Sequence, residues 1–196
     1  MVEWSLDAFR ACESVCSIVV AAPPGNVGDL GGHDLCVVPG GETRAQSVAN
    51  ALGAVETGYV AIHDAARPLL TPELVEALVA DLDAHEGVVG VIAAAPVNDT
   101  IKRGSLRTNS DRKEPLVVEA TEDRARLWRA QTPQVFRTDS LRAALAAAER
   151  PEEATDEAML VEAAGGTVLI HPVAEQNLKV TTALDLRVAE LLLAER

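Results

Sequence analysis

The stretch Val60-Ala61-Ile62-His63-Asp64-Ala65-Ala66-Arg67-Pro68 decides the fold of this chain. Its apolar start, without polar alternation, is typical of a strand that helices cover on both faces. Asp64 and Arg67 follow that strand directly, and open α/β sheets bind ligands at the carboxyl ends of their strands. A carboxylate there can hold Mg²⁺ or a ribose hydroxyl, and a guanidinium can hold an anion. The alternative is a structural ion pair that closes a loop, and His63 is expected to be a hydrogen-bonded core residue.

Similar apolar runs alternate with helical patterns along nearly the whole chain. The predicted strands share this apolar composition and are Ser17–Ala22, Leu35–Val38, Tyr59–His63, Val88–Ala95, Trp128–Gln131 and Thr167–His171. Polar caps predict the helix starts at Thr43 (helix over Ser47–Val55), Thr71, Thr138 or Asp139, Thr155 or Asp156, and Thr182, and a further helix is predicted over Val2–Arg10. This alternation predicts an α/β fold with three layers and a mostly parallel, Rossmann-like sheet.

The composition fits one globular domain over residues 1–196, with 48% hydrophobic and 24% charged residues. The 17 basic and 30 acidic residues give a net charge of −13, which excludes nucleic acid as a partner because its phosphates need a basic face. The longest apolar stretch, Gly87–Val97, is far shorter than the roughly 20 residues that cross a bilayer, so we expect no membrane span. The cysteines, Cys12, Cys16 and Cys36, lack metal-ligand spacing, so we expect buried free thiols in a reducing cytoplasm.

One segment interrupts the alternation of strands and helices. Lys102–Pro115 is polar and charged, and it lies between short β-capable pieces at Val97–Ile101 and Leu116–Glu119. Its composition alone favours a solvated surface loop. The alternative is a β-hairpin arm that projects from the domain.

Other polar groups also follow predicted strands. Gly40 and Gly41 precede a capped helix, where the backbone can approach a ligand closely. Thr100 and Thr132 offer hydroxyl groups, and Lys179, one of three lysines, precedes a capped helix, where it can reach a phosphate. Each of these features alone has an ordinary explanation as well: a tight turn, a loop hydrogen bond or a solvated lysine.

Six blocks of sequence, taken in order, are more specific than any one of them. They read GGETRAQSV, HDAARP, APVNDTIK, QTPQVF, TDEAMLVE and NLKVTT. Over essentially the whole chain they resemble the 2-C-methyl-D-erythritol 4-phosphate cytidylyltransferase family of non-mevalonate isoprenoid biosynthesis. The resemblance implies a fold of the nucleotide-diphospho-sugar transferase type. It also implies an enzyme that joins CTP to 2-C-methyl-D-erythritol 4-phosphate and releases pyrophosphate.

The resemblance assigns roles to individual residues. The residues that match the cytosine-reading positions are Gly41, Glu42 and Ser47. Those that match the positions lining the ribose, the Mg²⁺ and phosphate, and the erythritol are Asp64, Ala65 and Arg67, with Mg²⁺ near Asp64. Those that match the polyol phosphate positions are Thr100, Thr132, Thr155, Arg124 and Lys179, of which the last two are the cations that place the phosphate. The implied reaction is an in-line displacement at the α-phosphorus of CTP, which depends on positioning and charge neutralisation rather than on proton transfer.

Members of this family form homodimers through a projecting β-arm, so the resemblance favours the arm interpretation for residues 102–120. It also implies that Arg124 reaches the site of the partner subunit.

Two alternatives remain open at this point. Family members open with a strand and a glycine-rich loop that carries an arginine and a lysine, whereas the printed sequence begins at the helix that normally follows. One alternative is therefore an inactive, dimeric binding protein. The other is a cytidylyltransferase for a different polyol phosphate, such as ribitol 5-phosphate.

Overall fold

The computed structural model describes residues 1–26, 34–106, 116–174 and 177–195. Its helices are α1 (Val2–Arg10), α2 (Arg44–Leu52), α3 (Pro72–Ala84), α4 (Thr138–Ala147), α5 (Glu157–Ala163) and α6 (Ala183–Ala194). Its strands are β1 (Ile18–Ala22), β2 (Leu35–Pro39), β3 (Tyr59–Ile62), β4 (Val88–Pro96), β5 (Lys102–Leu106), β6 (Leu116–Thr121), β7 (Trp128–Arg137) and β8 (Thr167–Pro172). Short 3-10 turns are η1 (Pro24–Asn26), η2 (Arg124–Arg126) and η3 (Pro151–Glu153).

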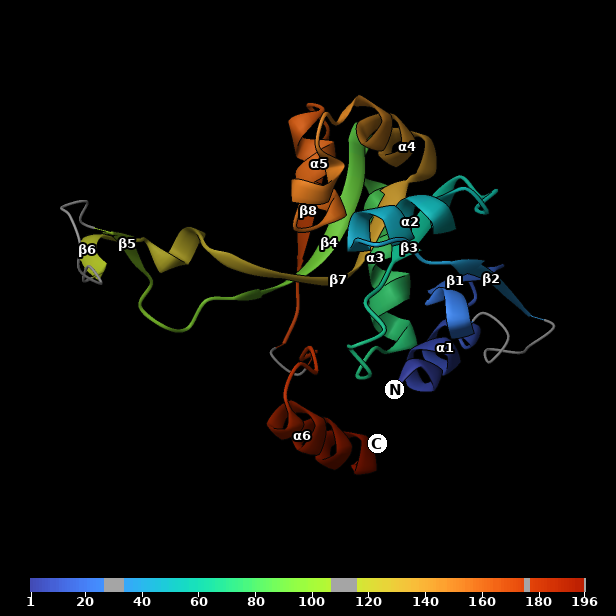
Figure 1. The fold of residues 1–196 in the computed structure, drawn as a ribbon, viewed down its shortest axis with the longest axis horizontal. Coiled ribbons are helices and arrows are strands. Elements are labelled where there is room, and N and C mark those ends of the chain that lie inside the picture. Colours follow the sequence, from blue (N-terminus) through green and yellow to red (C-terminus); the bar gives the residue numbers. More distant parts are fainter. Residues whose placement is uncertain (27–33, 107–115, 175–176, 196) are drawn as a thin grey trace.

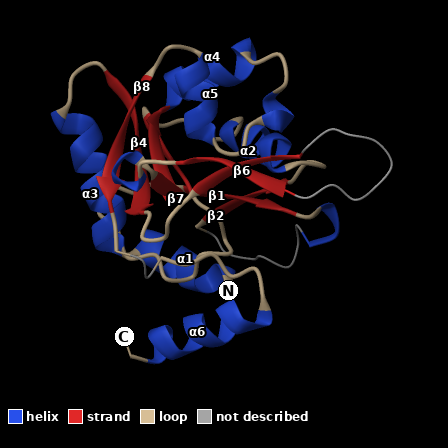
Figure 2. Ribbon diagram, turned by 90° about the vertical axis from the view of Figure 1, so that its left-hand side faces the viewer, coloured by secondary structure: helices blue, strands red, loops and turns tan. Residues whose placement is uncertain are grey.

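A sheet with the strand order β3-β7-β4-β8 forms the centre of the domain. Helix α3 covers one face of this sheet, and α4 and α5 cover the other, as Figure 2 shows. Successive residues of a strand point to opposite layers. Val91 of β4 packs with Leu78 of α3, whereas the next residue, Ile92, belongs to the cluster of Leu141 from α4. The predicted three-layer α/β architecture is therefore confirmed.

The central sheet is mixed, because β7 runs antiparallel to both of its neighbours. The pairs β1-β2 and β4-β8 are parallel. The chain passes from β4 to β7 through the projecting segment instead of a helix that crosses the sheet, and such a connection returns the strand antiparallel. The strand predicted over Trp128–Gln131 is also longer, since it continues to Arg137.

Residues 102–106 and 116–121 form the antiparallel pair β5-β6, which projects from the domain (Figure 1). The described part of the segment is thus a hairpin arm, and residues 107–115 between its strands lie outside the described residues. The prediction of a β-capable piece at Val97–Ile101 is wrong, because the first strand of the arm begins at Lys102. Residues 97–101 instead form the irregular connection that turns the chain out of β4.

The predicted helix caps are largely present. Thr43 forms a capping box with Gln46, and Thr71 and Thr182 each accept a hydrogen bond from a backbone N–H of the first turn. The helix after Thr43 nevertheless begins at Arg44, three residues before the predicted start, because a cap is followed directly by the first helical residue. Helix α4 has no side-chain cap at its start, so the caps expected at Thr138 or Asp139 are wrong.

The cysteines divide into two environments. Cys12 is buried at the end of α1, as expected, whereas Cys16 and Cys36 are exposed free thiols. Cys16 lies in the loop before β1, and the side chain of Cys36 points out of β2. Among the described residues, no helix is both long and apolar enough to cross a bilayer.

Gly90 of β4 pairs in register with Phe136 of β7, and a Cβ at Gly90 would lie 2.4 Å from Cδ1 of that ring. Phe136 is fully buried, so the ring cannot move without displacing the core. We expect Gly90→Ala to lower the free energy of unfolding by about 1–3 kcal/mol, the usual cost of overpacking. Urea denaturation measures this. Gly58→Ala is the matched control, since a Cβ there meets open space; equal midpoints for the two variants would contradict the prediction.

Candidate active site

Asp64 follows β3 and lies at the centre of a charged cluster. Its Oδ2 atom is 2.9 Å from Nζ of Lys179 and 3.9 Å from Nε of Arg67. Its Oδ1 atom accepts a hydrogen bond from Nε of Arg44 at 3.2 Å. The structure thus brings together Asp64, Arg67 and Lys179, three of the residues singled out from the sequence, and adds a fourth, Arg44.

The cations around Asp64 keep its carboxyl group ionised. Burial by itself would raise the pKa of Asp64, but the hydrogen bond from Lys179 and the charge of Arg44 outweigh burial and lower the pKa below its ordinary value. For Arg67, burial is the larger influence and lowers the pKa of the guanidinium. Arginine still stays protonated at neutral pH, so the cluster presents a carboxylate among three positive charges.

Glu157, the first residue of α5, is the second carboxylate of the cluster, and it was not among the residues singled out from the sequence. It is only 2% exposed, and Arg44 binds both of its oxygens, at 2.6 Å and 2.9 Å. Bidentate pairing of this kind is the strongest and most directional that an arginine makes. In the sequence, Arg44 directly follows the cap of one helix, and Glu157 directly follows the cap of another. Their contact spans 113 positions in the chain, which no local pattern reveals.

Strand β7 holds the backbone of Asp64 through a hydrogen bond to the side chain of Thr132. The backbone N–H of Asp64 donates to Oγ1 of Thr132 at 3.0 Å, and that hydroxyl lies 3.1 Å from Nδ1 of His63. Because Thr132 accepts from Asp64, its own proton is free to be donated to His63, whose Nε2 then donates to the carbonyl of Arg67 at 3.1 Å. His63 is therefore a hydrogen-bonded core residue, as expected. Thr132 is 4% exposed, so its hydroxyl serves the site through Asp64.

The glycine turn before α2 is held by the hydroxyl of Ser47. Ser47 accepts the backbone N–H of Gly41 and donates to the carbonyl of Thr43, both at 3.0 Å. A Cβ at Gly41 would lie 2.2 Å from Cβ of Gln46, so this tight turn requires glycine. Glu42 is exposed, and its backbone N–H donates to the side chain of Gln46. The turn places Gly41, Glu42 and Ser47 next to Arg44 on one short element.

The segment that carries Lys179 is fixed by Asn177, which was also not singled out from the sequence. Nδ2 of Asn177 donates to the backbone carbonyl of Thr132 at 2.7 Å. The backbone carbonyl of Asn177 accepts a hydrogen bond from Nη1 of Arg67, also at 2.7 Å. The backbone N–H of Val180 donates to the carbonyl of Ala66 at 2.8 Å. Backbone and side-chain hydrogen bonds on either side of Lys179 thus hold it next to Asp64.

The remaining predicted residues lie outside this cluster. Ala65 and Thr155 are exposed, the first beside Asp64 and the second just before the N-cap of α5. Thr100 is exposed in the connection to the arm. Arg124 lies in η2, which follows strand β6 of the arm, and its Nη1 atom donates to the carbonyl of Asn98 at 2.5 Å. The structure of one chain therefore does not bring Arg124 to Asp64.

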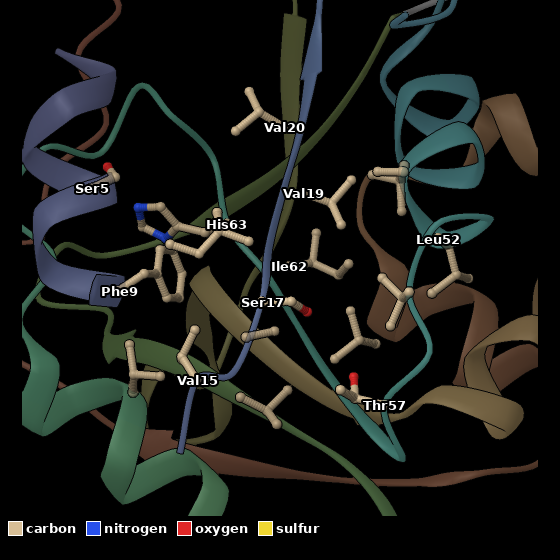
Figure 3. Close-up of a pocket in the computed structure, with 18 of the residues that line it drawn as sticks. Ser5, Phe9, Val15, Ser17, Val19, Val20, Leu52, Thr57, Ile62 and His63 are labelled. Atoms are coloured by element: carbon tan, nitrogen blue, oxygen red, sulfur yellow. The ribbon is translucent and has the colours of Figure 1, made fainter. Parts of the chain in front are cut away.

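A pocket of about 620 Å³ lies between β1 and β3, as Figure 3 shows. Phe9 of α1 and Leu52 of α2 line it from opposite sides, and apolar residues of both strands line it between them. Among the described residues, β1 pairs only with β2 and β3 only with β7, so each of the two strands has one edge without a partner. Arg44 and Asp64 also line this pocket, which therefore reaches the charged cluster.

Asp64 is the residue that could hold Mg²⁺, since carboxylate oxygens are the ligands that this cation prefers. No group of three or more His, Cys, Asp or Glu side chains suited to a metal occurs among the described residues. A single carboxylate fits Mg²⁺ nonetheless, because this ion is commonly bound by one or two carboxylates together with substrate phosphates and water.

Comparison with known proteins decides the family. The family described as "IspD: 2-C-methyl-D-erythritol 4-phosphate cytidylyltransferase" matches residues 1–195. The chain belongs to the 2-C-methyl-D-erythritol 4-phosphate cytidylyltransferase family. The resemblance seen in the six sequence blocks is thereby confirmed.

Relatives with this name are similar over nearly the whole chain. The 2-C-methyl-D-erythritol 4-phosphate cytidylyltransferase of Streptomyces coelicolor is 40% identical over 201 residues, which cover 96% of this chain and 72% of the relative. The bifunctional enzyme IspD/IspF of an Anaeromyxobacter species is 42% identical over 194 residues, or 95% of this chain and 48% of that relative.

A solved structure extends the similarity to the fold. The cytidylyltransferase of Thermus thermophilus superposes with a TM-score of 0.78 at 32% identity, over 98% of this chain and 88% of that one. The nucleotidyltransferase type of α/β fold and the cytidylyltransferase activity predicted from the sequence are both confirmed by these similarities.

His63 makes the stability of this cytidylyltransferase depend on pH. Burial lowers the pKa of His63 from 6.5 to about 4. As the pH falls, His63 is therefore protonated in the unfolded chain before it is protonated in the folded one. The contribution of neutral His63 to the free energy of unfolding is complete above pH 6.5 and is lost between pH 6.5 and 4. We expect a loss of roughly 3 kcal/mol over that range, measured by urea denaturation at pH 7 and pH 4. His63→Gln should flatten this dependence, whereas the same change at exposed His85 should not; an unchanged slope in His63→Gln contradicts the prediction.

Proposed function

We propose that the cluster around Asp64 binds the phosphates of both substrates during transfer of a cytidylyl group to 2-C-methyl-D-erythritol 4-phosphate. The observation that carries this proposal is the convergence of Arg44, Arg67 and Lys179 on one carboxylate. The chain as a whole has a net charge of −13. With Glu157 included, the cluster holds three cations and two carboxylates, so an anionic substrate meets a locally positive site on an acidic protein.

The proposed reaction needs no acid or base from the protein. A phosphate oxygen of the polyol phosphate forms a bond to the α-phosphorus of CTP, and the bond from that phosphorus to the β-phosphate oxygen breaks as pyrophosphate leaves. Mg²⁺ bound near Asp64 would neutralise charge on the phosphates. Arg67 and Lys179 act in this proposal by holding the phosphates and stabilising the negative charge of the transition state. A neutral, fully hydrogen-bonded His63 agrees with the lack of proton transfer.

The glycine turn is the proposed site of the cytosine base. The backbone N–H groups of Gly41 and Glu42 already donate to Ser47 and Gln46 within the turn, so in this proposal the base meets the backbone carbonyl groups beside Ser47. A surface made of backbone in this way suits a pyrimidine edge and leaves a purine little room. Ala65, exposed beside Asp64, is the proposed neighbour of the ribose.

The polyol phosphate is proposed to lie between Lys179 and the exposed threonines Thr100 and Thr155. We propose that Arg124 completes this half of the site from the partner subunit of a homodimer. Its position in η2, after strand β6 of the arm, supports this assignment. The free thiols support the further proposal that the enzyme works in the reducing cytoplasm.

Turnover with defined substrates tests the proposed function. CTP, Mg²⁺ and 2-C-methyl-D-erythritol 4-phosphate should yield pyrophosphate, with ATP a poor replacement for CTP. Turnover that requires ribitol 5-phosphate would favour the other polyol. Tight binding of CTP without any turnover would favour the inactive binding protein. Each result excludes the other two.

Lys179→Ala is expected to lower kcat/KM for 2-C-methyl-D-erythritol 4-phosphate. The decrease should correspond to a loss of about 2–4 kcal/mol in transition-state stabilisation, which is typical of one preorganised charge contact. The reason is that Lys179 would contact the phosphate whose oxygen is the nucleophile. Steady-state kinetics measure the effect, and urea denaturation checks that the fold is retained. Arg187→Ala removes an exposed cation of α6 and serves as the control. Kinetics of Lys179→Ala equal to those of the control would show a solvated lysine without a role.

The arm is expected to hold the homodimer through its apolar residues. Two adjacent valines of β6, Val117 and Val118, are 36% and 61% exposed in the single chain, so this projecting arm offers apolar surface that a partner subunit can cover. Val118→Asp should therefore give monomers in light scattering and weaken polyol phosphate binding, because Arg124 would no longer reach the partner's site. Glu119→Gln, at the next exposed position, is the control. A Val118→Asp protein that remains dimeric with unchanged affinity contradicts the prediction.

A further inference from the structure

Glu157 has no role in the reaction described so far, yet it is a buried carboxylate bound to Arg44 of the cluster around Asp64. A buried charge is strongly unfavourable unless a partner of opposite charge and suitable geometry compensates it. Arg44 supplies that partner with two parallel hydrogen bonds, from Nη1 at 2.6 Å and from Nη2 at 2.9 Å. The pair joins the first residue of α5 to the first residue of α2.

This pairing of the two Nη atoms of Arg44 fixes the direction of its third nitrogen atom, Nε. A guanidinium group is planar and rigid, so two fixed Nη atoms also fix where Nε points. Nε of Arg44 donates to Oδ1 of Asp64 at 3.2 Å. Glu157 thus reaches Asp64 through Arg44 without touching it.

The two oxygens of Asp64 consequently have different partners. Oδ1 is bound by Arg44, which Glu157 anchors. Oδ2 lies 2.9 Å from Nζ of Lys179, whose side chain is 43% exposed, and 3.9 Å from Nε of Arg67, which is beyond hydrogen-bond distance. An exposed, flexible ammonium group can move away from Oδ2 far more easily than the anchored guanidinium can leave Oδ1.

Glu157 is itself held in place from strand β7. The side-chain amide of Gln134, which is buried, donates to Oδ2 of Asp156 at 2.9 Å and accepts the backbone N–H of Ala158 at 3.3 Å. The residues before and after Glu157 are therefore both tied to the central sheet. These contacts hold the backbone on both sides of Glu157, and so fix the residue that anchors Arg44.

We propose that Glu157 is a positioning residue that acts through Arg44: it fixes Oδ1 of Asp64 and leaves Oδ2 as the oxygen that exchanges between Lys179 and a substrate-bound cation. This inference rests on the proposed function for the role of Asp64. The placement of Arg44 by Glu157 can be tested without any substrate.

The first test follows the exchange of the Nε proton of Arg44 with solvent by NMR, because this proton makes the bond to Asp64. In the unmodified protein it should exchange at least about tenfold more slowly than that of exposed Arg187. Glu157→Gln should remove this protection. Glu162→Gln, the same change at an exposed position of α5, should leave it intact. An unprotected proton in the unmodified protein, or a protected one in Glu157→Gln, overturns the proposal.

A second variant covers the case in which Glu157→Gln does not fold. Glu157→Asp keeps the negative charge but shortens the side chain by one methylene, so the two-point contact with Arg44 is lost. The same loss of protection is expected, and retained protection again overturns the proposal.

The second test measures binding of 2-C-methyl-D-erythritol 4-phosphate by calorimetry, and it separates positioning from charge by sign. Glu157→Gln removes a negative charge near an anion site, so electrostatics alone would tighten binding. Loss of positioning should instead weaken binding by about tenfold to a hundredfold, the effect of losing one hydrogen bond to a charged group. Glu162→Gln should remain within twofold of the unmodified protein. Unchanged or tighter binding in Glu157→Gln overturns the proposal.

The two tests distinguish failure of this inference from failure of the proposed function. If the unmodified protein neither binds nor converts the polyol phosphate, the proposed function is wrong, and with it the role given to Oδ2. The exchange measurement still decides whether Glu157 holds Arg44 on Asp64.

Discussion

The register of β7 against β3 is the constraint on which the site depends. Ile62 of β3 is paired with Gln134 of β7. Two residues beyond this pair, the backbone of Asp64 is hydrogen-bonded to the side chain of Thr132. The hydroxyl of Thr132 holds the backbone of Asp64, and its carbonyl holds Asn177 and so the segment of Lys179. Gln134 secures the start of α5. A shift of β7 by one residue would turn the side chains of Thr132 and Gln134 to the opposite face of the sheet, so one strand pairing places groups from three other segments.

The electrostatics of the site follow from this placement rather than from the composition. Acidic residues outnumber basic ones by thirteen in the chain. Positive charge is concentrated where Arg44, Arg67 and Lys179 meet, and the buried Glu157 prevents one of these cations from turning outward. A strongly acidic chain can therefore still present a small, locally positive site of the kind that the proposed phosphate binding needs.

The sequence predicted what depends on neighbours in the chain. The capping boxes at Thr43 and Thr182 join residues three positions apart, and the pair Asp64 and Arg67 follows directly from one strand, so local patterns contained both. The anchors at Glu157, Gln134 and Asn177 could not be predicted in this way, because each acts on a residue that is distant in the chain. The antiparallel direction of β7 was missed for a related reason. A strand's own residues do not encode its direction, which depends here on the arm that precedes it.

The side chain of Arg44 joins segments that are far apart in the sequence. Arg44 is the first residue of α2, directly after the glycine turn, and its guanidinium binds both Asp64 after β3 and Glu157 at the start of α5. A bidentate pair of this kind has a defined geometry, so the glycine turn has a fixed position relative to Asp64. One side chain therefore couples the part of the enzyme proposed to read the base to the part proposed to hold phosphate.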